Sequence, residues 1–122
     1  MIRYSDEHVW IRMEGDLGVV GITAHAQETL GDIVFVDLPA IGKLCVQHEV
    51  AGVVESVKAA ADVFTPVAGE IVAVNEQVRD NPAIANTDPQ GDGWFFKMKL
   101  VHPEELDTLM DEGTYVMFLQ NT

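Results

Sequence analysis

The 122-residue sequence has a single cysteine, Cys45, and no long apolar run. One cysteine cannot form an internal disulfide or a cysteine-based metal cluster, so we expect Cys45 to be a small buried residue rather than a reactive thiol. The longest apolar stretches, such as residues 33–36 and 50–54, are far shorter than the roughly 20 residues that a membrane-spanning helix needs. We therefore expect no membrane-spanning helix.

Basic residues are also scarce, because 7 lysines and arginines face 20 acidic residues, for a formal charge of −13. This charge repels phosphate backbones and anionic lipid headgroups, so we expect neither nucleic acids nor membranes as partners. It would speed encounters with proteins that present basic surfaces, but it would equally serve as a solubility device. The N-terminus lacks the features of a secretory signal and of a transit peptide, which predicts a cytosolic protein.

No low-complexity tract or flexible linker divides the chain, and its length and 48% hydrophobic content fit one compact domain over residues 1–122. Turn residues recur at intervals of about ten residues, which favours a mainly β fold of the small sandwich or barrel type. Residues 9–12 and 17–22 flank Gly15 as a predicted hairpin. Apolar and lysine side chains alternate over residues 94–100, as in a strand with one buried face.

Two helical segments are also predicted. Thr23 can cap a short internal helix over residues 24–30, which Gly31 would end. A second helix begins near Pro103 and keeps apolar residues on one face as far as Gly113, beyond which the chain retains helical spacing. We expect this C-terminal helical tail to pack on the β-structure.

An internal repeat occupies the middle of the chain. Residues 50–57 match residues 67–74 at the first three positions and at the last. Taken as a true repeat, the match predicts paired strands related by a pseudo-twofold axis and a sandwich of two similar halves. Gly52 and Gly69 hold equivalent places in the two units, where a backbone requirement at a bend is the expected role.

Lys58 falls in the connection between the two repeat units, at the tip of a predicted hairpin. Position alone fits an ordinary solvated lysine. Small side chains surround it, however, and the chain has only three other lysines, which are Lys43, Lys97 and Lys99. Lys58 is therefore also a candidate functional residue.

Several collinear segments resemble a known protein family. The most specific are residues 30–39, which read Leu-Gly-Asp-Ile-Val-Phe-Val-Asp-Leu-Pro, and residues 55–59, which read Glu-Ser-Val-Lys-Ala. Other matching positions follow in the same order, namely Tyr4, His8, Trp10, 20–23, Ala26, Gln27, Pro66, Gly69, Glu70, 74–76, Asn86, Pro89, Gly93 and Trp94. Together they resemble the glycine cleavage H proteins over nearly the whole chain. The resemblance implies a lipoyl-domain-like hybrid of barrel and sandwich.

The resemblance also implies that Lys58 carries lipoate through an amide bond. Biotin carriers typically place methionine on both sides of their lysine, and 2-oxoacid dehydrogenase lipoyl domains usually place aspartate before it, whereas Val57 and Ala59 stand here. The arm would accept an aminomethyl group from a pyridoxal-phosphate-dependent glycine decarboxylase and present it to a tetrahydrofolate-dependent aminomethyltransferase. Dihydrolipoyl dehydrogenase, with FAD, would reoxidise it, and a lipoate-attaching enzyme would load it.

A surface cleft that shelters the loaded arm is a further implication of the resemblance. His8 and Asp62 match the family there, whereas Val9 stands where the family usually has a carboxylate. An ordinary packed or solvent-facing role stays open for His8. Glu55 is either a recognition residue for the modifying enzyme or a solvated strand carboxylate.

The main hypothesis is a monomeric carrier rather than an enzyme, since a carrier needs no catalytic acid or base and must present its tip to several enzymes. A second is an H-like lipoyl protein that acts in lipoate relay or redox signalling. A third is a binding module in which Lys58 is unmodified. No metal site is expected, because the sequence positions of His25, His48 and His102 do not have the spacing of metal ligands.

Overall fold

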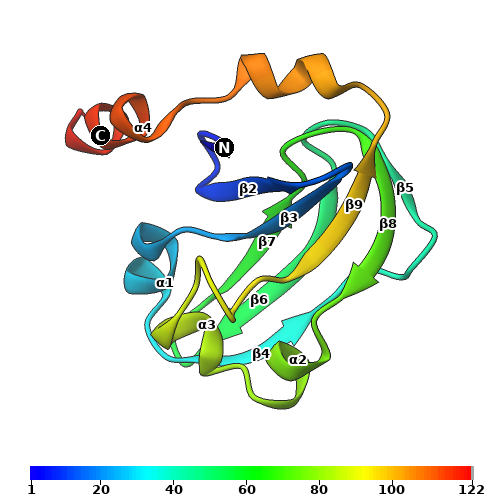
Figure 1. Cartoon of the computed structure of the whole chain (residues 1–122). Helices are drawn as coiled ribbons and strands as arrows, with labels where there is room; N and C mark the ends of the chain where they lie inside the picture. The colour runs from blue at the N-terminus through cyan, green and yellow to red at the C-terminus, as the bar shows by residue number, and fades with distance from the viewer. Residues whose placement is uncertain (122) are drawn as a thin grey trace.

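The computed structural model describes residues 1–121, whose strands form two antiparallel β-sheets (Figure 1). The larger sheet has the order β1-β2-β3-β9-β8-β5, with the bounds Ile2–Tyr4, Val9–Glu14, Leu17–Ile22, Phe96–Leu100, Gly69–Val74 and Leu44–Cys45. The smaller sheet has the order β4-β6-β7, with the bounds Ile33–Asp37, Val50–Ser56 and Ala60–Phe64. The predicted mainly β class is confirmed.

Side chains of β2 alternate between two apolar clusters, as the two-residue period of a strand requires. Val9 and Ile11 enter the main core between the two sheets, where they are almost fully buried. Trp10 points to the opposite face and packs with Tyr4 and Tyr115. Both faces of the larger sheet are therefore covered at the N-terminal strands.

The predicted hairpin and the short internal helix are both present. Gly15 forms the β2–β3 turn with a φ of 60°. Thr23 caps α1 (Ala24–Leu30) by accepting a hydrogen bond from the backbone N–H of Ala26 at 3.2 Å, and Gly31 ends the helix. Two helices that the sequence patterns did not predict, α2 (Glu76–Asp80) and α3 (Ile84–Thr87), connect β8 to β9. Nowhere in residues 1–121 is a helix long and apolar enough to span a membrane.

The C-terminal tail is helical as predicted, but it is divided differently. A 3-10 helix, η1 (Pro103–Thr108), precedes a separate helix, α4 (Glu112–Gln120), on the same side of the molecule as the N-terminus (Figure 1). The helix expected from Pro103 toward Gly113 does not continue that far, because η1 ends at Thr108. The carboxylate of Asp111 accepts a hydrogen bond from the N–H of Thr114 at 2.8 Å, so α4 begins before Gly113. An N-cap of this kind satisfies helix N–H groups and outweighs the unfavourable glycine.

The two repeat units become β6 and β8, which lie in different sheets. β6 pairs with β4 and β7, while β8 pairs with β5 and β9, so the prediction that the two units pair with each other is wrong. The equivalent glycines nevertheless meet the same requirement. A Cβ at Gly52 would collide with the carbonyl oxygen of Asp37, and one at Gly69 would lie 2.5 Å from the carbonyl oxygen of Lys99.

Cys45 is buried, with 5% of its surface exposed, as predicted. Burial raises the pKa of its thiol, and Glu49 raises it further, while Lys43 opposes both. A thiol with a raised pKa holds little of the thiolate that reacts with oxidants and metals.

Candidate functional site

Lys58 stands at the tip of the β6–β7 hairpin. The backbone N–H of Ser56 donates to the carbonyl oxygen of Ala59 at 2.8 Å, which leaves Val57 and Lys58 as a two-residue loop. The hydroxyl oxygen of Ser56 also accepts hydrogen bonds from the N–H groups of Lys58 and Ala59, each at 3.1 Å. The Lys58 side chain is exposed and forms no hydrogen bond or ion pair with any residue that the structure describes. The backbone is thus fixed, and the amine is available.

The connection between α1 and β4 is held by the side chain of Asn86 on α3. Its Nδ2 group donates to the carbonyl oxygen of Gly31 at 2.9 Å and to Oε1 of Gln27 at 3.0 Å. Its Oδ1 atom accepts from the N–H of Ile33 at 2.9 Å. One amide side chain therefore fixes both ends of this short connection.

The same connection supports the lysine hairpin from the side. The N–H of Val57 donates to the carbonyl oxygen of Asp32 at 3.0 Å. A Cβ at Gly31 would lie 3.2 Å from Cε of Lys58, so the aliphatic part of the lysine lies on a surface that has no side chain. Asn86 thereby stabilises the lysine tip without touching it.

Exposed apolar side chains flank the lysine hairpin. Val57 is 67% exposed, and Val34 and Phe35 on the neighbouring β4 are 56% and 48% exposed. Glu55 lies opposite Phe35 in the β4–β6 register, is exposed, and has no hydrogen bond or ion pair within residues 1–121. A protein that binds around Lys58 would meet these apolar groups beside a free carboxylate.

A cleft of about 230 Å³ opens between the β6–β7 hairpin, α1 and the start of β2. Its floor is apolar and nearly fully buried, being formed by Val9, Ile22, Val54 and Val63. Titratable side chains also line it, namely Glu7, His8, His25 and Asp62. Such a cleft suits a ligand with an apolar body and a polar or charged end.

His8 has a strained backbone and a fixed side chain. Its φ is 65°, in the left-handed region that few residues other than glycine adopt. Its Nδ1 atom lies 2.8 Å from the hydroxyl of Tyr115, which in turn lies 2.8 Å from the hydroxyl of Thr23. Burial lowers the pKa of His8, and His25, whose ring centroid is 4.7 Å away, lowers it further, while Asp6 opposes this. Neutral His8 is therefore favoured.

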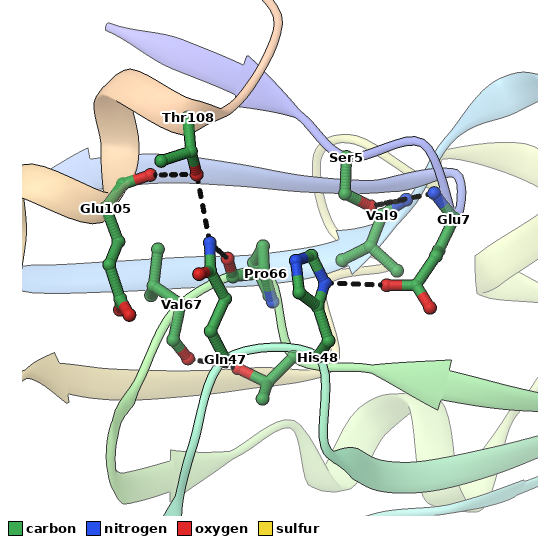
Figure 2. Close-up of polar contacts among 10 residues, drawn as sticks. Ser5, Glu7, Val9, Gln47, His48, Pro66, Val67, Glu105 and Thr108 are labelled. Atoms are coloured by element: carbon green, nitrogen blue, oxygen red, sulfur yellow. Dashed lines mark hydrogen bonds and ion pairs between the residues drawn. The ribbon is translucent and has the colours of Figure 1, made fainter.

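Glu7 is held at both ends. The hydroxyl oxygen of buried Ser5 accepts hydrogen bonds from the N–H groups of Glu7 and Val9, each at 3.2 Å. The Oε1 atom of Glu7 lies 3.0 Å from Nδ1 of His48 (Figure 2). This pair joins the N-terminal loop to the β5–β6 loop, which lies far away in the sequence.

The structure brings together three of the five residues that the sequence singled out. His8, Val9 and Asp62 all line the cleft, whereas Lys58 and Glu55 do not. Both nevertheless belong to the hairpin whose strands form one wall of the cleft. Val9 contributes to the buried floor, so it supplies an apolar surface there.

Two lining residues, Glu7 and His25, were not predicted from the sequence. Helical spacing could have found His25, because Ala26, Thr29 and Leu30 line the cleft from the same face of α1. No local pattern marks Glu7, which reaches the cleft through the turn that precedes β2.

In the part of the chain that the structure describes, no group of three or more His, Cys, Asp or Glu side chains could hold a metal ion.

Comparison with known proteins gives one consistent family. The family model described as Glycine cleavage H-protein matches residues 2–122. The glycine cleavage system H protein of Chromobacterium violaceum is 57% identical over 93% of this chain and 90% of its own length. That of Parvibaculum lavamentivorans is 50% identical over 98% and 96%.

A solved structure agrees with these sequence relatives. The crystal structure of a glycine cleavage system H protein from Mycobacterium marinum superimposes with a TM-score of 0.89 at 35% identity, covering 98% of this chain and 96% of that one. The match thus extends over nearly the whole chain. This chain belongs to the glycine cleavage H-protein family.

Proposed function

We propose that this chain is a lipoyl carrier and that Lys58 is the residue to which lipoate is joined. The observation that carries the proposal is an exposed, unpaired lysine on a fixed tip whose flanking strands line an apolar cleft. Bound through an amide, lipoate supplies a dithiolane whose disulfide can be reduced and reoxidised. Attachment also removes the positive charge of the lysine.

The dimensions of the hairpin and the cleft fit such an arm. Ala61 and Val63 line the cleft three and five residues after Lys58, which corresponds to roughly 10–17 Å along a strand. A lipoyl-lysine side chain places its ring about 11 bonds from the Cα atom, and each bond of an extended chain advances roughly 1.25 Å, so the arm reaches about 14 Å and covers most of this range. The apolar floor would exclude water from the arm, while Asp62 and His8 stand at its polar side.

The family is the carrier component of the glycine cleavage system, and the full-length match favours this role over lipoate relay or redox signalling. The proposed partners are a pyridoxal-phosphate-dependent glycine decarboxylase, a tetrahydrofolate-dependent aminomethyltransferase, dihydrolipoyl dehydrogenase with FAD, and a lipoate-attaching enzyme. The carrier would deliver the aminomethyl group among them without being an enzyme itself. We further propose one domain over residues 1–122, a monomer and a cytosolic location.

Mass spectrometry tests the attachment site. The chain is coexpressed with a lipoate-attaching enzyme and supplied with lipoate, and its intact mass and peptides are measured. We expect one lipoyl group on Lys58, none in Lys58→Arg, and full modification in the control Lys43→Arg, since Lys43 lies outside the tip and is paired with Glu49. Modification elsewhere, or an unmodified Lys58, would contradict the proposal.

A second measurement separates glycine cleavage from the other lipoyl roles. The lipoylated chain is mixed with glycine decarboxylase, and exchange of labelled carbon dioxide into the carboxyl group of glycine is followed. We expect exchange with the lipoylated chain and none with Lys58→Arg, because the latter has no arm. A lipoylated chain that supports no exchange would favour the relay role.

A further inference from the structure

A second hollow, of about 310 Å³, shares no lining residue with the cleft. Four segments that are far apart in the sequence form it, namely the turn before β2, the β5–β6 loop, the connection between η1 and α4, and α4 itself. Neither Val57 nor Lys58 lines it. A group bound in this hollow would therefore leave the lysine tip free.

Hydrogen bonds hold the walls of the hollow in place. Tyr4 and Met110 exchange two backbone hydrogen bonds of 2.8 Å, which join β1 to the segment before α4. Gln47 donates through Nε2 to the hydroxyl of Thr108 at 3.0 Å, which joins the β5–β6 loop to the end of η1 (Figure 2). The hollow is thus formed before any ligand enters it.

The polar groups of the hollow include acceptors that are not yet used. The carboxylate of Asp6 is exposed and has no hydrogen bond or ion pair with another described residue. His48 donates through Nδ1 to the Oε1 atom of Glu7, because a carboxylate has no hydrogen to give. In the neutral ring Nε2 is then an acceptor, and it points away from Glu7 (Figure 2). The hydroxyl of Thr108, by contrast, already donates to the carbonyl oxygen of Glu105 at 2.6 Å.

An aromatic ring forms part of the opposite wall. Phe118 on α4 lines the hollow together with Leu109 and Met110. The ring of Phe118 stacks on that of Tyr115, with 6.3 Å between their centroids, so its position is fixed. A carboxylate beside an aromatic ring suits a guanidinium group, which is planar, carries five N–H donors and stacks on aromatic faces.

We propose that this hollow is a docking site for an arginine side chain of another protein. The carboxylate of Asp6 accepts hydrogen bonds from the guanidinium group, and the ring of Phe118 stacks against its plane. Lysine fits less well, because its ammonium group is a compact, strongly hydrated charge without a planar face. The formal charge of −13 steers proteins with basic surfaces towards the chain.

A second copy of this chain is a poorer occupant, because its own arginines are already engaged. Arg3 and Arg12 each donate to a backbone carbonyl oxygen, at 3.0 and 2.9 Å, and Arg79 forms an ion pair with Glu76. Two copies would also repel each other through their equal negative charges.

The test uses the full, unmodified chain and three probes, which are the N-acetyl amides of arginine, citrulline and lysine. Citrulline has nearly the shape of arginine but no charge. Binding is followed by NMR through the ring of Phe118 and the carboxyl carbon of Asp6. We expect the arginine probe to shift both signals and to bind more tightly than the other two.

Asp6→Asn should weaken binding of the arginine probe about two- to fivefold. Asp16→Asn is the matched control, because Asp16 is also exposed and without a partner within residues 1–121, but lies at the β2–β3 turn outside the hollow. It should bind the probes as the wild type does. Phe118→Leu should reduce the preference for arginine over lysine, because leucine keeps an apolar wall but cannot stack.

Equal binding of the arginine and citrulline probes would overturn the proposal. So would shifts confined to residues of the cleft, such as His25 and Val63, because they would place the probe there. A shift of Phe118 that depends on protein concentration without any probe, together with a doubled mass in solution, would assign the hollow to a second copy instead. These measurements need no lipoate, so a Lys58 that stays unmodified would contradict the carrier role and not this assignment.

Discussion

Gly31 and Lys58 meet at the base of the lysine hairpin, where a Cβ at Gly31 would lie only 3.2 Å from Cε of Lys58. Gly31 also has a φ of 80°, so the residue that ends α1 is the one that leaves room for the lysine stem. The end of a helix and the presentation of the proposed attachment site are thus linked through one glycine.

Gly31→Ala should slow lipoyl attachment to Lys58 as well as destabilise the fold. The positive φ alone should lower the free energy of unfolding by about 1–2 kcal/mol. Gly42→Ala is the control, because Gly42 has a φ of 94° and no atom lies within 4 Å of the place that an added methyl group would take. It should be similarly destabilised but be modified at the normal rate. Equal attachment rates in the two variants, followed by intact mass over time, would refute the link.

Asn86→Ala should loosen the lysine tip from a distance. The substitution leaves the N–H of Ile33 and the carbonyl oxygen of Gly31 without their partner, which should lower the free energy of unfolding by about 2–4 kcal/mol. Hydrogen exchange at the N–H of Val57 should become faster, because its acceptor belongs to the same connection. The exposed Asn81, whose side chain has no hydrogen-bond partner in residues 1–121, provides the control Asn81→Ala. Unchanged exchange at Val57 would show that the tip does not depend on Asn86.

Local patterns predicted the elements whose determinants lie within a few residues of each other. Thr23 and Gly31 bound α1 as expected, and Gly15 forms the expected turn, because caps and tight turns depend on immediate neighbours. The cap at Asp111, which starts a separate helix, was not identified from the sequence, so the division of the C-terminal tail into η1 and α4 was not predicted.

Local patterns could not predict contacts between segments that lie far apart in the sequence. Glu7 meets His48 across 41 positions of sequence, and His8 meets Tyr115 across 107. No periodicity or motif in the sequence predicts either pair, because tertiary packing alone brings these segments together. The repeat likewise identified two similar strands correctly but not the fact that they lie in different sheets.

The lowered pKa of His8 predicts a loss of stability in mild acid. Because the folded state favours the neutral imidazole, the unfolded chain binds the proton more readily below about pH 6.5, the ordinary value for histidine. The free energy of unfolding should therefore fall as the pH drops from about 6.5 through the lowered pKa of His8. Below that lowered pKa, His8 should cause no further change in stability. His25→Gln should raise the pKa of His8, because it removes a nearby positive charge.

NMR titration of the His8 ring measures its pKa directly. The charged residues around the ring, Asp6, Glu7 and Asp62, are left unchanged. The control is His102→Gln, since His102 contacts Glu104 on the C-terminal segment and does not line the cleft. That variant should leave the His8 titration as it is in the wild type. A His8 midpoint at or above the ordinary value would show that the ring is more hydrated than its contacts indicate.

Tyr115 should determine which nitrogen of neutral His8 carries the proton. The hydroxyl of Thr23 is buried, and its hydrogen has an acceptor only if it donates to the hydroxyl of Tyr115, which then donates to Nδ1 of His8. This chain leaves the proton of neutral His8 on Nε2. In Tyr115→Phe the preference should disappear, and the free energy of unfolding should fall by about 1–2 kcal/mol.

Nitrogen-15 chemical shifts of the His8 ring distinguish the two tautomers. Tyr4→Phe is the matched control, because the ring of Tyr4 stacks on that of Tyr115 at 4.6 Å while its hydroxyl bonds to Gln90 rather than to His8. It removes a hydroxyl from the same aromatic stack and should keep the Nε2–H form. If Tyr115→Phe also keeps that form, another group selects the tautomer, and the C-terminal helix does not set the hydrogen-bonding character of the cleft.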